Sequence, residues 1–457
     1  MNPLIFREYD IRGLVGTDLT DATVEDIGRG FGTWLRRRGR QTTCVGHDVR
    51  ESSPAFAAAL ARGLVQTGCD VLMIGSVTTP ILYWSILHTQ RDGGVMVTGS
   101  HNPIEYNGLK ACEGPLAIPA DAIQDVRGLI ECRDFETGDG RIEEADLAAE
   151  YRADIAGRFR LKEGMKVVVD AGNGAAGPHV VPVLESLGCQ VVPLYCEPDG
   201  TFPNHLPDPE VPAYMQTLMD TVRSEGAALG LGFDGDADRV GVIDENGRKI
   251  SADWILTLFA RKLLEEHPGG TVIYDVKCTD FVPQDVEAHG GRAMMGRTGH
   301  SILKRNVEQN DAIIGGELSG HIVFGKEYYL IDDGLYAGLK VLQILSDSGQ
   351  PLSALFADFP ETFSTPEIKV PCGDAEKMHV IETLREQLAK DHDIDTLDGI
   401  RITFDEGWAL VRASNTTANL TLRVEGRTED AKVRYLDFLR EELAPFDAVD
   451  ITPIPTS

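Results

Sequence analysis

Thr42-Thr-Cys-Val-Gly-His-Asp48 is an apolar segment that ends in a carboxylate. Ser52-Ser-Pro54 follows, with the cap residues and the proline that are typical of a helix start, and residues 55–66 form a helical pattern. A second apolar segment, residues 70–75, comes next. This order predicts a strand, a helix and a strand, with polar residues at the carboxyl end of the first strand. Parallel sheets with outer helices are built from such units.

The same order of segments occurs twice more. Met165-Lys-Val-Val-Val-Asp170 leads through a glycine-containing loop into a helical segment and then into residues 189–194. Gly270-Thr-Val-Ile-Tyr-Asp275 leads to a helical segment at 283–289 and then to residues 291–295. This repetition predicts three similar α/β domains with mixed, mostly parallel sheets.

Beyond residue 367 the pattern changes to that of a smaller α+β domain. Two helical patterns enclose three short strand patterns, in the order 374–390, 399–404, 408–413, 419–425 and 429–443. We predict four domains, at residues 1–148, 149–253, 254–366 and 367–457, with Ser364-Thr-Pro366 as a hinge. The tail after Pro445 is expected to be a loose end.

Composition narrows the class of protein. The chain has 457 residues, 42% of them hydrophobic, and its net charge is −29 because Asp and Glu outnumber Lys and Arg by 72 to 43. That charge disfavours nucleic acid or an anionic membrane as a partner. No segment has the length of a membrane span. The eight cysteines form no Cys-x-x-Cys pair, which favours free thiols in a reducing cytoplasm over disulfides or zinc.

Ser100 lies in Val95-Met-Val-Thr-Gly-Ser-His-Asn-Pro103, where a buried strand pattern runs into a tight loop. A serine at the carboxyl end of a strand can be a nucleophile or a phosphate acceptor. An ordinary polar turn explains the segment equally well when it is taken alone. Lys110 follows ten positions later; it is either a surface residue or a cation that neutralises a transferring phosphoryl group.

The strongest single signal is Phe233-Asp-Gly-Asp-Ala-Asp-Arg239, which follows an apolar strand pattern. Three carboxylates, Asp234, Asp236 and Asp238, alternate with small residues and can converge on one hard cation. The loop lacks the length and the final Glu of an EF-hand, so Mg²⁺ held by carboxylates and a phosphate oxygen is favoured over calcium. A solvated acidic turn is the weaker alternative, since three like charges repel one another without a cation. Arg239 would add a second positive charge for phosphate.

Five further segments carry polar side chains that suit a sugar phosphate. Each also has an ordinary structural explanation, as an edge strand, a structural His or a glycine-rich turn. Two guanidinium groups and a phenol near the amino terminus suit an anion, and His300 suits acid–base chemistry with Lys277 nearby. Glu317 and Ser319 suit vicinal hydroxyls, and an arginine followed by hydroxyls and an amide suits phosphate. The candidates are Tyr9, Arg12, Lys277, His300, Glu317, Ser319, His321, Arg412, Ser414, Asn415 and Thr416.

Taken together and in this order, five motifs resemble the α-D-phosphohexomutase family, and most closely its bacterial phosphomannomutase/phosphoglucomutase branch. They span nearly the whole chain: Tyr-Asp-Ile-Arg-Gly (9–13), Thr-Gly-Ser-His-Asn-Pro (98–103), Asp-Gly-Asp-Ala-Asp-Arg (234–239), Gly-Glu-Leu-Ser-Gly-His (316–321) and Arg-Ala-Ser-Asn-Thr (412–416). The resemblance implies four domains around one central cleft. Two positions depart from the family pattern: Leu109 replaces a common Phe, and Ala418 replaces the usual Pro of the phosphate loop.

The resemblance also implies a mechanism. Ser100 is expected to carry a phosphoryl group, with Mg²⁺ bridging it to the three aspartates. Transfer to a hexose monophosphate gives a hexose 1,6-bisphosphate, which serves as intermediate and activator and returns its other phosphate to Ser100. Lys110 and Arg239 would offset charge, and His300 with Lys277 would move protons. Mannose and glucose phosphates both remain candidate substrates, since these sugars differ only in the orientation of one hydroxyl.

Three alternatives remain at this level. The substrate could be glucosamine phosphate, although Leu318 is not the residue that branch tends to carry. Water could accept the phosphoryl group, which would make the protein a phosphatase. The chain could also be a sugar-phosphate sensor without turnover, although no expected catalytic residue is missing. A cytoplasmic monomer or weak dimer is expected.

Overall fold

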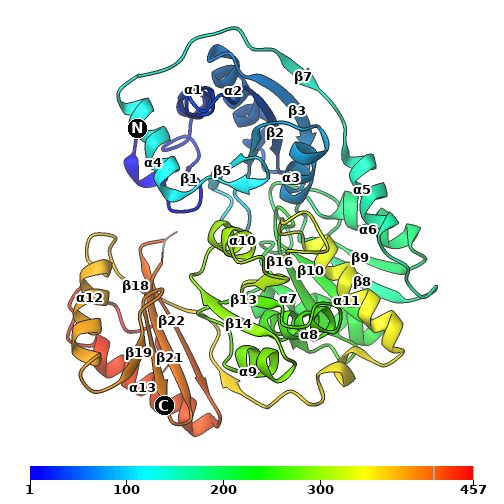
Figure 1. The fold of residues 1–457 in the computed structure, drawn as a ribbon, viewed down its shortest axis with the longest axis vertical. Helices are drawn as coiled ribbons and strands as arrows, with labels where there is room; N and C mark the ends of the chain where they lie inside the picture. The colour runs from blue at the N-terminus through cyan, green and yellow to red at the C-terminus, as the bar shows by residue number, and fades with distance from the viewer. Residues whose placement is uncertain (415–416, 456–457) are drawn as a thin grey trace.

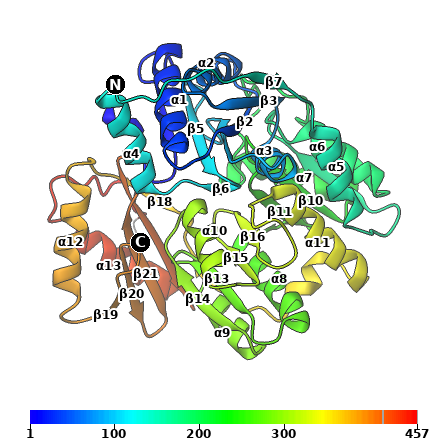
Figure 2. The ribbon, with the colours of Figure 1, turned by 45° about the horizontal axis from the view of Figure 1, so that its top comes forward.

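The computed structural model describes residues 1–414 and 417–455. Its chain forms four units in sequence order, each built on its own sheet (Figure 1). The first unit lies opposite the third and fourth, and the second connects them along one side (Figures 1 and 2). Three mixed sheets and one antiparallel sheet confirm the predicted fold class. The exact domain limits stay a prediction, and β17 (Phe363–Ser364) already pairs with the sheet of the fourth unit.

The first unit has the strand order β1-β5-β4-β2-β3-β7, with β6 paired to β5. The strands around β2 are parallel, as the repeated strand–helix–strand pattern predicted, and β1 and β5 are antiparallel. The elements are η1 Pro3–Ile5, β1 Ile11–Leu14, α1 Asp21–Arg36, β2 Thr42–His47, α2 Ser53–Gln66, β3 Asp70–Ser76, α3 Thr79–His88, β4 Gly93–Val97, β5 Tyr106–Glu113, β6 Leu116–Ala117, α4 Ala120–Glu131 and β7 Ile142–Glu144.

The second and third units repeat the parallel core with antiparallel edges, in the orders β12-β11-β10-β8-β9 and β14-β13-β15-β16. Their central strands β8, β10 and β13 are buried along nearly their whole length. The elements are α5 Ala148–Gly157, β8 Lys166–Asp170, α6 Gly177–Ser186, β9 Gln190–Leu194, α7 Pro212–Glu225, β10 Leu229–Phe233, β11 Val240–Asp244, β12 Lys249–Ile250, α8 Ala252–Glu266, β13 Thr271–Asp275, α9 Phe281–Ala288, β14 Arg292–Gly296, α10 His300–Gln309, β15 Ile314–Gly316, β16 Ile322–Phe324, α11 Gly334–Ser348 and η2 Leu352–Phe356.

The fourth unit is an antiparallel sheet, β17-β22-β21-β20-β19, with β18 also on β22 and two helices. The elements after β17 are β18 Ile368–Pro371, α12 Lys377–Leu388, β19 Asp393–Asp395, β20 Ile400–Phe404, β21 Gly407–Ala413, β22 Asn419–Gly426 and α13 Glu429–Leu443. The expectation of a loose tail was wrong. Val449 bridges to Cys372, and both Val449 and Ile454 are buried in the core of this unit, because the apolar tail residues cover its edge.

Hydrophobic cores show which units are coupled. One continuous core joins the second and third units and extends to α3 and one face of the sheet of the first unit. The other face of that sheet and most of the fourth unit have separate cores, while Trp408 and Leu410 of the fourth unit pack with Val276 of the third. The eight cysteines all lie in the described residues and are free thiols. Among the described residues, no helix is both long and apolar enough to cross a membrane.

Asp333 ties the second unit to the third. Its carboxylate caps α11 by accepting from the Tyr336 backbone N–H at 3.0 Å, and it accepts from the hydroxyls of Tyr151 on α5 (3.0 Å) and Tyr328 (2.8 Å). Burial raises the pKa of Asp333 to about 6. A single side chain therefore satisfies three donors in the shared core.

We expect Asp333→Ala to destabilise the protein by roughly 2–4 kcal/mol, since it removes a helix cap and leaves two buried hydroxyls without an acceptor. Calorimetry should show a clearly lower Tm than for wild type. Asp347→Ala, at an exposed position near the end of α11, is the control and should leave Tm nearly unchanged. Equal Tm values for the two variants would contradict this role of Asp333.

Candidate active site

The loops that follow β4 and β10 meet at Ser100. Its hydroxyl donates to Asp234 Oδ2 at 2.9 Å and lies 3.1 Å from His101 Nδ1. Ser100 is buried and has a φ of 48°, a left-handed conformation that is uncommon for a residue with a side chain. The surrounding structure stabilises this strained backbone conformation, which directs the hydroxyl toward the acidic loop at residues 234–238.

Arg50 stabilises the conformation of this loop, a role that the sequence patterns did not reveal. Its guanidinium group is buried and donates to four backbone carbonyls of the loop, those of Ser100, Asn102, Pro103 and Tyr106, at 2.6–2.9 Å. A Cβ on Gly99 would lie 2.4 Å from Arg50 Nε, so only glycine fits there. The one available signal was the position of Arg50, two residues after a carboxylate at the tip of β2.

Asp48 is that carboxylate, and it completes the support of the loop. Its Oδ2 accepts from the Thr98 hydroxyl at 2.8 Å and from the Gly99 backbone N–H at 3.1 Å. Asp48 therefore lies at the carboxyl end of its strand, as predicted. Its carboxylate hydrogen-bonds to the serine loop and is not left to bind a ligand.

The Arg50 geometry gives a prediction for Arg50→Lys. An ammonium group cannot reproduce the planar fork that contacts four carbonyls, so the loop should shift. Displacements of about 1 Å can cost about 10²-fold in rate, so we expect kcat to fall by about that factor while KM changes little. Steady-state kinetics would separate the two parameters, with Arg62→Lys on the exposed face of α2 as the control. A kcat equal to that of wild type would rule out this positioning role.

The three carboxylates of the acidic loop converge as their spacing predicted. Asp234, Asp236 and Asp238 are fully buried, and one oxygen from each lies within 4.8 Å of the others. Asp236 Oδ1 and Asp238 Oδ1 have no hydrogen-bond partner among the described residues. Buried carboxylate oxygens without donors are costly, and hard divalent cations bind such oxygens. The residues present therefore fit a magnesium ion.

Two cations compensate the negative charge of this loop. Lys110 Nζ lies 2.6 Å from both Asp236 Oδ2 and Asp238 Oδ2. Burial by itself lowers the pKa of Lys110, but the carboxylates outweigh this effect and raise it above its usual value, so the side chain is an ammonium ion. Burial, opposed by Arg239, raises the pKa of Asp234 to about 8.

Arg239 is the second cation and shares an acceptor with the serine. Its Nε donates to Asp234 Oδ2 at 3.0 Å, the same oxygen that accepts from Ser100. Its other contacts are longer, at 3.4 Å to Asp208 and Glu210, and its buried NH2 has no hydrogen-bond partner among the described residues. The guanidinium group therefore has a free donor beside the serine.

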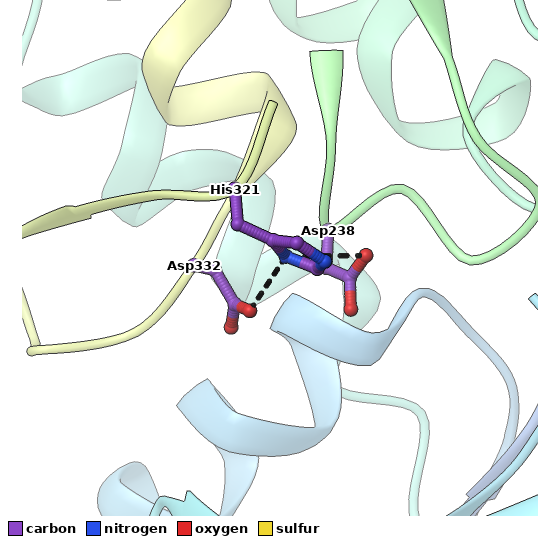
Figure 3. Close-up of side chains that lie close together, drawn as sticks. All are labelled: Asp238, His321 and Asp332. Carbon is purple, nitrogen blue, oxygen red and sulfur yellow. Dashed lines mark hydrogen bonds and ion pairs between the residues drawn. The ribbon is translucent and has the colours of Figure 1, made fainter. Parts of the chain in front are cut away.

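The third unit contributes a loop between β15 and β16. Glu317 accepts from the Ser319 hydroxyl at 2.9 Å and from the Gly299 backbone N–H at 2.5 Å, at the start of α10. His321 Nδ1 lies 3.0 Å from Asp332 Oδ2 and 3.8 Å from Asp238 Oδ1 (Figure 3). The structure thus brings His321 to the acidic loop, and it adds Asp332, which no sequence pattern had indicated.

His300 and Lys277, which the sequence paired for proton transfer, have different partners. His300 begins α10, and its ring stacks on that of His321 with centroids 5.5 Å apart. Burial lowers the pKa of His300 well below its usual value, which favours the neutral ring. Lys277 Nζ lies 2.5 Å from Glu367 and 3.6 Å from Asp275. Although burial lowers the pKa of Lys277, these carboxylates raise it overall, so this group is a cation rather than a base.

The remaining candidates come from the two ends of the chain. Arg12 donates to Asn102 of the serine loop at 2.6 Å, and the Tyr9 hydroxyl donates to the Thr298 carbonyl at 2.5 Å. In the fourth unit, Arg412 donates to Asp398 at 3.0 Å, and the Ser414 hydroxyl lies 2.9 Å from that of Thr417. Asn415 and Thr416 lie outside the described residues.

A cavity of about 540 Å³ adjoins the loop between β15 and β16, which contains the predicted sugar-binding residue Ser319. Its walls come from the second unit, from α8 and residues 318–320 of the third, and from residues 364–367, Lys369 and Arg423 next to or in the fourth. Ser100 does not line this cavity, so the cavity lies beside the reactive serine and does not enclose it. Three of the four units therefore enclose space next to Ser319.

Four sheet-bearing units in series, with loops of the first three meeting around a buried serine and three carboxylates, define a phosphohexomutase-type fold. Family models described as phosphoglucomutase/phosphomannomutase match the chain in four parts: alpha/beta/alpha domain I at residues 3–137, domain II at 149–247, domain III at 251–363 and the C-terminal domain at 367–442. The chain therefore belongs to the α-D-phosphohexomutase family, as its motifs indicated.

Relatives match over nearly the full length. The phosphomannomutase/phosphoglucomutase of Pseudomonas aeruginosa is 42% identical, covering 99% of this chain and 97% of the relative. The phosphoglucomutase of Neisseria meningitidis is 41% identical, covering 93% and 94%. A crystal structure of a phosphoglucomutase/phosphomannomutase family protein from Burkholderia thailandensis has a TM-score of 0.91 at 39% identity, covering 97% of both chains.

Proposed function

We propose that this protein interconverts the 1- and 6-phosphates of a hexose, mannose, glucose or both, by way of a phosphorylated Ser100. The observation that carries this proposal is the hydrogen bond from Ser100 to Asp234, beside the free donor of Arg239 and the ammonium group of Lys110. A serine in this position can hold a phosphoryl group and release it. The full-length relatives named for these sugars support the choice of substrate.

The transfer from phosphoserine balances without water. The bond between phosphorus and the Ser100 oxygen breaks, and a new bond forms to O6 of a hexose 1-phosphate. An imidazole takes up the O6 hydroxyl proton, and the Ser100 oxygen regains a proton, so the serine is left as a free hydroxyl. The product is a hexose 1,6-bisphosphate, which turns over in the site and returns the phosphoryl group from O1 to Ser100. Lys110 and Arg239 oppose the charge on the moving group, so positioning supplies most of the remaining catalysis. A magnesium ion on Asp234, Asp236 and Asp238, with a phosphate oxygen of phosphorylated Ser100, would add further charge compensation there.

Proton transfers are assigned to the imidazole pair His300 and His321. Asp332 Oδ2 is hydrogen-bonded to His321 Nδ1 at 3.0 Å and lies 3.7 Å from His300 Nδ1. Lys277 is assigned instead as a fixed positive charge, because Glu367 and Asp275 hold its proton. This changes the role proposed for Lys277 from the sequence and keeps the role of His300.

Substrate binding is divided between the two ends of the sugar. Glu317, Ser319 and His321 are proposed to contact the ring and its hydroxyls. The non-reacting phosphate is assigned to residues of the fourth unit, which are Arg412, Ser414, Asn415 and Thr416. Tyr9 and Arg12 of the amino-terminal motif are proposed to line the same space. Because the fourth unit has its own core, it can close over the substrate and exclude water, which would otherwise hydrolyse the phosphoserine.

³¹P NMR tests this function directly. Purified protein is incubated with Mg²⁺, a trace of glucose 1,6-bisphosphate and either mannose 1-phosphate or glucose 1-phosphate. Conversion of both into 6-phosphates without growth of free phosphate is expected for a dual-specificity mutase, and conversion of one alone would fix the sugar. Release of inorganic phosphate in step with substrate loss would instead show a phosphatase. No change in either tube would contradict the proposal and would make glucosamine 1-phosphate the next substrate.

A further inference from the structure

One imidazole and two carboxylates form a group beside the acidic loop. His321 comes from the loop just before β16, Asp332 from the segment before α11 and Asp238 from the loop before β11, and the three side chains point toward one another (Figure 3). One ligand atom from each lies within 4.8 Å of the other two. Only Asp238 belongs to the proposed magnesium site, so this group is a second, adjoining set of donors.

Two lysines each contact one oxygen of a carboxylate in this group, so the second oxygen of each carboxylate can face His321. Asp238 Oδ2 contacts Lys110 Nζ at 2.6 Å, and Asp332 Oδ1 contacts Lys304 Nζ at 2.5 Å. The other oxygens, Asp238 Oδ1 and Asp332 Oδ2, therefore turn toward the imidazole, and Asp238 Oδ1 has no hydrogen-bond partner among the described residues. Lys110 hydrogen-bonds its carboxylate and Lys304 forms an ion pair with Asp332, so each lysine holds the outer oxygen of one carboxylate.

His300 supplies a second and independent observation. Its side chain is only 7% exposed, and neither ring nitrogen has a hydrogen-bond partner among the described residues. Nδ1 lies 3.7 Å from Asp332 Oδ2, the same oxygen that faces His321. A buried imidazole with two unsatisfied nitrogens is costly, and a metal ion in this group would give one of them a partner.

We propose that His321, Asp332 and Asp238 bind a transition-metal ion of the zinc type, with His300 as the fourth ligand. Zinc takes nitrogen and oxygen ligands at about 2.0–2.2 Å in a tetrahedron, which places ligand atoms about 3.4 Å apart. The observed separations from His321 Nδ1, 3.0 Å and 3.8 Å, lie on either side of that value. Imidazole favours zinc, whereas Mg²⁺ prefers six oxygen ligands, so the two adjoining sites select different metals.

Such an ion inhibits the enzyme. It occupies the imidazole assigned to proton transfer and competes for Asp238, one of the three carboxylates of the acidic loop. The binding site itself does not depend on the proposed function, because its test measures the bound metal and not turnover. A failed mutase assay and a failed metal titration are therefore distinguishable results.

Cobalt(II) is the probe for this site, since it replaces zinc and gives intense visible bands only in tetrahedral coordination. The full-length protein, stripped of metal with a chelator, is expected to bind Co²⁺ with these bands and to lose them when Zn²⁺ is added. His321→Gln should weaken Co²⁺ binding by at least about 100-fold, since removal even of outer partners typically costs 10–100-fold. The matched control is His379→Gln, on the exposed surface of α12, which should leave the titration unchanged.

A second variant separates the two sites. Asp234 contacts Ser100 and Arg239 and is not part of the His321 group, so Asp234→Asn should keep the tetrahedral bands. Absence of bands in wild type, bands that persist in His321→Gln, or bands lost in folded Asp234→Asn would each overturn the proposal. Circular dichroism checks folding. Should His321→Gln fail to fold, His300→Gln gives the same comparison, with a loss of at least about tenfold expected.

Discussion

Ser100→Ala is expected to lower turnover by at least about 10⁴-fold while the protein stays folded, because no other group can accept and return the phosphoryl group. The lost hydroxyl contacts His101 Nδ1 and donates to Asp234, which keeps its contact with Arg239. The variant should still bind sugar phosphates, since the contacts assigned to the sugar lie in the third and fourth units. Its ³¹P spectrum should contain no phosphoserine signal after incubation with a bisphosphate.

A coupled assay for glucose 6-phosphate would measure the loss, and a thermal melt would confirm that the fold is intact. Ser186→Ala, at an exposed position near the end of α6, is the matched control and should behave as wild type. Turnover in Ser100→Ala equal to that of wild type would make Ser100 a structural residue and would remove the basis of the proposed mechanism.

Lys110→Met is expected to lower kcat by about 10³-fold, in the range found when one donor or cation is removed from a phosphoryl-transfer or oxyanion site. Methionine keeps much of the length and volume of lysine, so the variant removes the charge with little change in packing. The same variant should bind Mg²⁺ more tightly than wild type. Lys110 Nζ contacts Asp236 and Asp238, the carboxylates that would hold the ion, and a like charge there opposes binding.

The two effects of Lys110→Met have opposite signs, which makes the prediction specific. Turnover is measured at saturating Mg²⁺, and metal affinity is measured from the rise of Tm with Mg²⁺ concentration. Lys390→Met, exposed just after α12, is the control. A fall in kcat together with weaker Mg²⁺ binding would mean that the lysine only orders the acidic loop, and unchanged kcat would exclude Lys110 from the reaction.

Local patterns in the sequence determined most of the fold. The strand–helix–strand order around Thr42–Asp48 predicted β2, α2 and β3 to within one or two residues, and α13 begins and ends as predicted. These elements depend on the period of apolar residues and on caps and glycines within each segment, so neighbouring residues suffice. The close spacing of Asp234, Asp236 and Asp238 indicated their convergence for the same reason.

Only the tertiary structure decided which side chains meet across the units. Lys110 contacts Asp236 and Asp238 from 126 and 128 positions away, and Ser100 contacts Asp234 from 134 positions away. Asp332 had no local signal and Arg50 only its position near the tip of β2, because their roles come from partners that other segments supply. The tail after Pro445 looked loose by composition and is held by the core of the fourth unit. Packing between segments sets these contacts, and no single segment of the sequence contains that information.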